Sequence, residues 1–142
     1  MLAIMTLASC GKKDTVKPPL TDINVLATNW VTREWGGVSN NVLLFTIDKT
    51  TAKGMVDAIS GDGYGFTTGT VIYSNIKPNG DGTFSASGSY TPTGSDGMLT
   101  RSATMSLQNN NTQLTVYYPA LNASYPAITY VYQQTPYALL GN

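Results

Sequence analysis

Side chains able to do acid–base or nucleophilic chemistry are scarce in this 142-residue chain. It has no histidine, one cysteine (Cys10) and one glutamate (Glu34). Without histidine, the Ser-His-Asp and Cys-His arrangements and most zinc sites are excluded. A carboxylate pair for glycoside hydrolysis would need Glu34 or an aspartate opposite a second aspartate, and no spacing indicates one. We therefore expect no enzyme, no catalytic residue, no metal site and no cofactor.

Arg101 is the charged residue whose position is most informative. It interrupts an apolar row with a period of two, so its side chain is expected to point inward. The row consists of Leu99, Ala103, Met105 and Leu107. A buried guanidinium needs a partner, and Glu34, on the same strand face as Trp30, is the candidate. Two interpretations stay open. Trp30, Glu34 and Arg101 line an interior site for an anionic or polar ligand, or Arg101 stacks on Trp30, pairs with Glu34 and has a structural role.

Tyrosines crowd the last quarter of the chain. They are Tyr117, Tyr118, Tyr125, Tyr130, Tyr132 and Tyr137. Tyr130 and Tyr132 are expected in the core, because tyrosine favours half-buried strand positions. Tyr118 and Tyr125 flank the loop 119–124, so we expect them to be exposed. There they could bind a ligand by stacking on sugar rings, or could anchor a partner protein.

Cys10 ends the run Leu7-Ala8-Ser9-Cys10, which follows a short apolar opening. This run resembles the lipobox of Gram-negative bacterial lipoproteins. The resemblance implies that residues 1–9 are a signal peptide and that Cys10 carries the lipid. Secretory signals begin with a basic region. No Lys or Arg precedes Cys10, so we expect that region upstream of Met1. The alternative is an N-terminal strand with a buried free thiol.

The lipobox resemblance divides the chain into three parts. Residues 1–9 are the signal peptide, 10–19 a lipidated flexible tether with several charges and a Pro pair, and 20–142 one domain. The lipid implies a membrane-anchored protein of the bacterial cell envelope, most simply at the outer membrane. Residues 20–142 carry five cationic and seven anionic side chains, a net charge of minus two. That balance excludes the basic footprint of a nucleic-acid binder.

Short runs rich in Val, Ile, Tyr and Thr alternate with Gly, Asn, Asp and Pro clusters, which predicts an all-β domain. The expected strands are 29–35, 42–48, 53–59, 68–76, 83–90, 98–107, 113–118 and 127–133. Short connections such as 77–82, with Asn-Gly and Asp-Gly, predict hairpins and an antiparallel meander. Closing it into a barrel would remove its exposed edges, and a two-sheet sandwich is the alternative. Residues 20–28 are expected to hold a helical turn capped by Thr21.

The period of two also assigns strand faces. Phe84, Ala86, Gly88 and Tyr90 share one face. Ser85, Ser87 and Ser89 take the opposite face and are expected to contact solvent.

A strand with an early tryptophan, Asn29-Trp30-Val31-Thr32, precedes a hairpin that starts with Leu43-Leu44-Phe45-Thr46-Ile47. This arrangement resembles lipocalin-like (calycin) domains. The resemblance implies a small β-barrel that binds without catalysis, its ligand a small apolar molecule, a glycan or a partner protein. The alternative is an accessory subunit of an envelope complex with no ligand of its own. An interior cavity would favour the first role. A filled interior with an exposed apolar or tyrosine-rich patch would favour the second.

Overall fold

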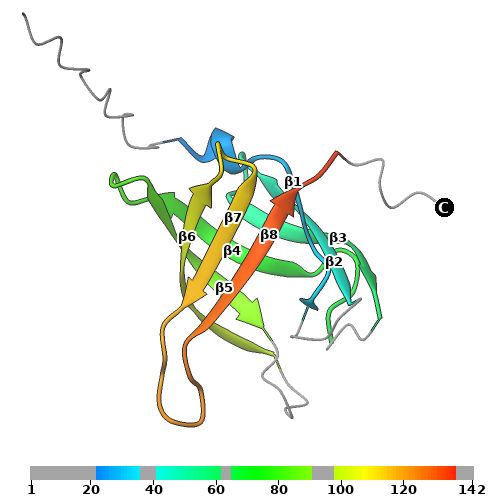
Figure 1. The fold of residues 1–142 in the computed structure, drawn as a ribbon, viewed down its shortest axis with the longest axis vertical. Helices are drawn as coiled ribbons and strands as arrows, with labels where there is room; N and C mark the ends of the chain where they lie inside the picture. The colour runs from blue at the N-terminus through cyan, green and yellow to red at the C-terminus, as the bar shows by residue number, and fades with distance from the viewer. Residues whose placement is uncertain (1–21, 36–40, 62–64, 91–97, 137–142) are drawn as a thin grey trace, which may run out of the picture.

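Eight antiparallel strands form an up-and-down meander that closes into a barrel in sequence order (Figure 1). This computed structural model describes residues 22–35, 41–61, 65–90 and 98–136. Its strands are β1 (Asn29–Thr32), β2 (Val42–Asp48), β3 (Lys53–Ser60), β4 (Val71–Pro78), β5 (Thr83–Tyr90), β6 (Leu99–Gln108), β7 (Gln113–Tyr118) and β8 (Ile128–Gln134). The predicted all-β barrel is confirmed, and the sandwich is wrong because β1 pairs with β8. The lipobox run, the tether and Thr21 lie outside the described residues.

Five strands differ from their predicted bounds: β3, β6 and β8 differ by one residue at one or both ends, and β1 and β4 differ by more. The larger differences at the end of β1 and the start of β4 have local causes. β1 ends at Thr32, because the chain bends at residues 33 and 34 after its last pair with β2. β4 begins at Val71 rather than at residue 68. Thr70 Oγ1 accepts a hydrogen bond from the Thr67 backbone N–H (3.0 Å), and Gly69 has a φ of +86°, so a turn occupies these residues.

The β6–β7 hairpin is turned by a run of asparagines. Asn109, Asn110 and Asn111 have φ values of 50°, 57° and 67°. Asparagine tolerates this left-handed region better than other residues with a side chain. The turn residues thus fix where β6 ends and where β7 begins.

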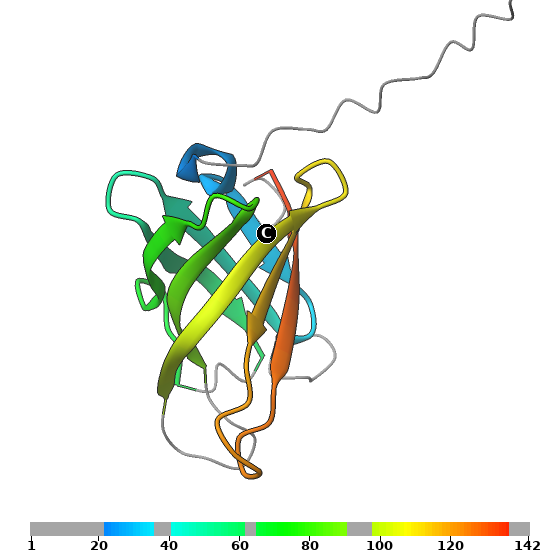
Figure 2. The same ribbon diagram turned by 90° about the vertical axis from the view of Figure 1, so that its left-hand side faces the viewer.

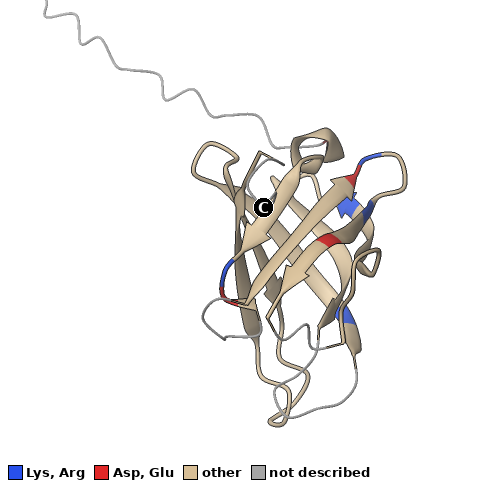
Figure 3. Ribbon diagram, turned by 90° about the vertical axis from the view of Figure 1, so that its right-hand side faces the viewer, with Lys and Arg blue, Asp and Glu red and all other residues tan. Residues whose placement is uncertain are grey.

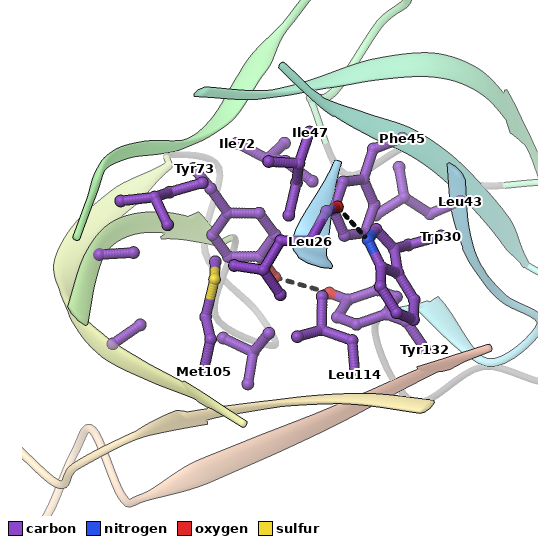
Figure 4. Close-up of a cluster of buried hydrophobic side chains, with 14 of the residues drawn as sticks. Leu26, Trp30, Leu43, Phe45, Ile47, Ile72, Tyr73, Met105, Leu114 and Tyr132 are labelled. Atoms are coloured by element: carbon purple, nitrogen blue, oxygen red, sulfur yellow. Dashed lines mark hydrogen bonds between the residues drawn. The ribbon is translucent and has the colours of Figure 1, made fainter. Parts of the chain in front are cut away.

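A short 3-10 helix, η1 (Ile23–Leu26), covers one end of the barrel (Figures 1 and 2). Its cap is Asp22 rather than Thr21, and the Asp22 carboxylate accepts a hydrogen bond from the Asn24 N–H at 2.8 Å. Leu26 is buried, and the Leu26 carbonyl accepts a hydrogen bond from Trp30 Nε1 at 3.0 Å (Figure 4). The apolar side of the turn and this bond hold η1 against the core.

The core lies inside the barrel and follows the predicted alternation. Leu43, Phe45 and Ile47 of β2 are buried. The predicted inward residues of β5 are buried as well, whereas Ser85 is exposed and Ser87 and Ser89 are partly exposed. Because each strand has one apolar face, closing the sheet places these faces together inside the barrel. In the described part of the chain, no helix has the length and apolarity needed to cross a membrane.

Candidate functional site

Side chains fill the interior that the strands enclose. Around Phe45, the rings of Tyr73 and Tyr132 lie at centroid distances of 5.3 and 4.9 Å. Figure 4 shows these rings meeting Leu26, Trp30 and other apolar side chains across the barrel. Tyr73 and Tyr132 join hydroxyl to hydroxyl at 2.8 Å. This part of the barrel is therefore a packed core rather than a cup for an apolar ligand.

The residues predicted to form an interior site do not come together. Trp30 is fully buried beside η1, where it belongs to the core. Glu34 lies past the end of β1 with an exposed side chain, because the strand alternation stops at Thr32. Arg101 bonds to the β7–β8 loop, which lies at the end of the barrel opposite η1 (Figures 1 and 2). The inward orientation of Arg101 is confirmed, whereas the stack on Trp30 is wrong.

Arg101 is held by aromatic rings and by backbone carbonyls. Its guanidinium carbon lies 4.5 Å from the ring centroid of Tyr90 and 5.7 Å from that of Tyr118. Its terminal nitrogens donate to the carbonyls of Tyr125 (3.4 Å) and Pro126 (3.5 Å). These lengths are at the long limit for N–H···O bonds, so the loop carbonyls compensate the charge weakly.

Tyr118 is fully buried, so its predicted exposure is wrong, and Tyr125 is only half-buried. Tyr118 continues the inward row of Leu114 and Val116 on β7. The period of two within β7 was the sequence signal that could have predicted the burial of Tyr118. The neighbouring Tyr117 is exposed instead, with 44% of its surface accessible.

Burial also changes the acidity of the interior phenols. It raises the pKa of Tyr130 to about 12 and moves the pKa of Tyr118 well above its ordinary value. Tyr73 and Tyr132 shift in the same direction, chiefly because burial disfavours the phenolate. Burial therefore favours the neutral form of all four phenols.

The outward side chains of β5 to β8 form a continuous uncharged surface, which we call the neutral face. Its members are Thr83, Ser85, Ser87, Ser89, Thr100, Ser102, Thr104, Ser106, Thr115, Tyr117, Thr129 and Val131. Arg101 is the one charged residue of these four strands, and it points inward. The neutral face therefore offers hydroxyl groups, which both donate and accept hydrogen bonds, and no charge.

Strand pairing sets the hydroxyl groups side by side. Ser85 lies opposite Thr104, Ser87 opposite Ser102, and Ser89 opposite Thr100. The Ser89 and Thr100 hydroxyls are 3.2 Å apart. Facing side chains in such pairs lie about 5 Å apart, so the hydroxyls form a regular array along β5 and β6.

A shallow hollow of about 350 Å³ crosses this array at the β4 border. Ser87 and Ser102 line it from the neutral face, and Asn75 and Lys77 line it from β4. β4 bulges here, because the register shifts between Ser74 and Lys77 and Asn75 has a φ of 53°. Bulges commonly re-aim side chains beside binding sites. This one leaves Asn75 outward and exposed at the rim.

Tyr117 and Val131 give the neutral face an apolar flank. Tyr117 pairs with Thr104 on β6 and with Thr129 on β8, and Val131 is two residues beyond Thr129. Val131 is 41% exposed. A ring beside a row of hydroxyls can stack against an apolar ligand face while the hydroxyls bond to its polar edge.

The other side of the barrel carries charges of both signs. Figure 3 views the barrel from the side on which β2 and β3 lie in Figure 1, and basic and acidic segments are visible there. β2 and β3 contribute Asp48, Lys53 and Asp57. Among the described residues, no three His, Cys, Asp or Glu side chains are grouped closely enough to hold a metal ion. The two sides of the barrel therefore differ in charge: the neutral face is uncharged, and the side of β2 and β3 carries both signs.

Comparisons with protein-family models, with curated proteins and with solved structures give no match for this chain.

Proposed function

We propose that this protein is a lipid-anchored binding protein of the bacterial cell envelope that acts without catalysis and binds an uncharged glycan on its neutral face. Cys10 would carry the lipid at the outer membrane, and residues 11–19 would act as a spacer. Lipid chains contribute about 0.8 kcal/mol per buried methylene, so two or more chains hold a small domain on a membrane. The resemblance to the lipobox supports this anchor.

The observation that carries the glycan proposal is the chemistry of the neutral face. A neutral sugar presents hydroxyls and an apolar ring face, and it carries no charge that would need an ion pair. Paired Ser and Thr hydroxyls match the first property, and Tyr117 matches the second. The hollow at Asn75 and Ser87, with Lys77 on its β4 rim, gives the surface a place where one sugar ring could bind. The packed core argues against an apolar ligand inside the barrel.

An accessory subunit that binds only a protein partner is the second candidate, because exposed apolar side chains favour it. Met55 on β3 and Val71 on β4 are cross-strand partners and are both exposed. Stable protein interfaces concentrate large apolar and aromatic side chains at their centre. The neutral face offers mainly hydroxyls, so a glycan suits that face better than a protein does.

Binding to neutral oligosaccharides tests the proposal. We would use the chain from residue 10 onward with Cys10→Ser, titrate it with fractionated envelope glycans and follow the amide NMR signals. A shallow face should bind with a Kd of about 0.1–1 mM. Shifts confined to β5–β8 are expected. If no glycan shifts the amide signals and the chain instead retains an envelope protein, the accessory role is supported.

Two variants and one control locate the site. Tyr117→Ala should weaken binding by about 3–10-fold through the lost stacking. Ser102→Glu should abolish it by placing a charge in the middle of the array. Met55→Glu adds the same charge to an exposed position on β3 and should leave binding unchanged. Equal losses from Ser102→Glu and Met55→Glu would refute the assignment to the neutral face.

The anchor has its own test in cells. Cys10→Ser should move the protein from the membrane fraction to the soluble fraction and prevent labelling by a radioactive fatty acid. Cys10 is the sole cysteine, so the label has no second thiol to enter. Unchanged membrane partition of the Cys10→Ser variant would refute lipid anchoring at this residue.

A further inference from the structure

The end of the barrel beneath the β7–β8 loop contains a buried cation without a carboxylate partner among the described residues. Arg101 is 5% exposed. Among the described residues, it contacts the rings of Tyr90 and Tyr118 and two loop carbonyls. Glu34 is exposed, and Asp62 and Asp96 lie outside the described residues. A buried charge is costly unless it is paired, so Arg101 is suited to bind an anion.

Polar atoms left without a partner gather at the same end. Among the described residues, Arg101 Nε, the Tyr90 hydroxyl and the Tyr118 hydroxyl are buried and have no partner within hydrogen-bond distance, although the Tyr118 and Tyr73 phenols are close enough to affect each other's pKa. The Tyr90 and Tyr118 rings are 5.2 Å apart, and the Arg101 guanidinium lies over both, so the three residues form one cluster. Each of them can donate a hydrogen bond. Buried polar groups are normally satisfied, so a cluster of spare donors calls for an acceptor.

Aromatic contacts extend this cluster to a fourth donor. Tyr130 contacts Tyr118 (6.0 Å) and Trp35 (5.0 Å), measured between ring centroids. Trp35 Nε1 is also buried without a partner among the described residues. The end of the barrel away from η1 is thus rich in donors, whereas the hydroxyls of Tyr73 and Tyr132 deeper in the core satisfy each other.

We propose that Arg101, Tyr90 and Tyr118 form a binding site for a carboxylate. The carboxylate would accept from Arg101 Nε and from the two phenol hydroxyls, and the guanidinium would neutralise its charge. Charge-assisted bonds of this kind are about twice as strong as neutral ones. The carboxylate could belong to a free small acid or to the end of an acyl chain. This site is inside the barrel end and is independent of the neutral face and of the proposed glycan ligand.

Thermal unfolding in the presence of carboxylates tests this site. The chain from residue 10 onward with Cys10→Ser is titrated with acetate and, separately, with decanoate, at constant ionic strength. A carboxylate that binds the folded state should raise Tm in a saturable way, by roughly 10 °C at about 100 times its Kd. Equal Kd values for both acids would identify a free small carboxylate. A decanoate Kd at least tenfold lower would identify an acyl chain. No saturable rise with either acid would overturn the proposal.

Variants assign the response to named residues. Arg101→Gln should abolish the rise, and Tyr90→Phe, which removes one donor and keeps the ring, should raise the Kd about tenfold. Tyr90→Phe keeps the test decisive if Arg101→Gln does not fold. Lys53→Gln removes an exposed cation on β3 and should leave the response intact. The proposal is overturned if Lys53→Gln loses the response as Tyr90→Phe does. It is equally overturned if Asp96→Asn lowers Tm and creates carboxylate binding that the parent chain lacks, because Asp96 would then be the partner of Arg101.

Discussion

The hydroxyl pair of Tyr73 and Tyr132 yields the sharpest prediction about stability. β4 and β8 are four strands apart in an eight-stranded barrel, so these side chains come from opposite walls. Their hydroxyl oxygens are 2.8 Å apart, and both residues are buried (Figure 4). The perturbation is removal of one hydroxyl at a time, Tyr73→Phe or Tyr132→Phe, followed by the double variant.

The expected magnitude follows from leaving one buried hydroxyl unpaired. Such a group costs about 1–3 kcal/mol, so each single variant should lose about 2 kcal/mol of unfolding free energy. Removing both hydroxyls leaves neither unpaired, and the double variant should lose less than the sum by about 1–2 kcal/mol. For a domain of this size, 1 kcal/mol corresponds to about 4 °C in Tm, so each single variant should melt about 8 °C lower.

Urea unfolding, monitored by tryptophan fluorescence, gives the unfolding free energy of the parent protein, the two single variants and the double variant. Trp30 and Trp35 are both buried, so unfolding changes the surroundings of the two indole rings. Tyr117→Phe is the matched control, because its hydroxyl is on an exposed side chain, and its unfolding free energy should change by less than about 0.5 kcal/mol. Additive losses in the cycle, or losses no greater than that of the control, would refute the reasoning that these hydroxyls satisfy each other.

Three further predictions concern space, acidity and the helical turn. Gly88→Ala should cost about 1–3 kcal/mol in urea unfolding, because the new Cβ would collide with the buried Tyr118 ring, and an unchanged stability would show that the ring is free to move. Burial raises the pKa of Tyr130 to about 12. The stability that this neutral phenol contributes is complete below about pH 10, where the unfolded phenol is also protonated, and is lost as pH rises from about 10 to 12. Urea midpoints and absorbance at 295 nm across that range check this, and ionisation of all tyrosines near pH 10 before unfolding would contradict it. Trp30→Phe removes the donor to the Leu26 carbonyl and should cost about 2–3 kcal/mol, with faster amide exchange in η1 as the diagnostic sign.

The sequence predicted much of the fold because the barrel depends on local signals. Alternation with a period of two placed the inward rows of β2, β5 and β6, and Gly and Asn residues placed the turns. Strand bounds erred where a side chain bonded to its neighbours, as Thr70 does with Thr67 before β4. Such bonds depend on atomic positions that composition and spacing do not reveal.

The candidate site was less predictable, because it depends on which strands become neighbours. Glu34 and Arg101 have opposite charges and were expected to pair, but the chain bend after Thr32 turns Glu34 outward. The hydroxyl array needed the register that sets Ser87 opposite Ser102. Each strand alone showed only ordinary polar residues on one face.

By itself, the sequence determined an all-β domain, its turns and the inward side of most strands, because backbone alternation and turn chemistry act over a few residues. It also determined the scarcity of catalytic side chains, since no histidine is present. Only the tertiary structure decided what surrounds Arg101, that Tyr118 is buried, and that the outward side chains of β5 to β8 form one uncharged surface. Those properties arise from packing and strand register, which bring together residues far apart in the chain.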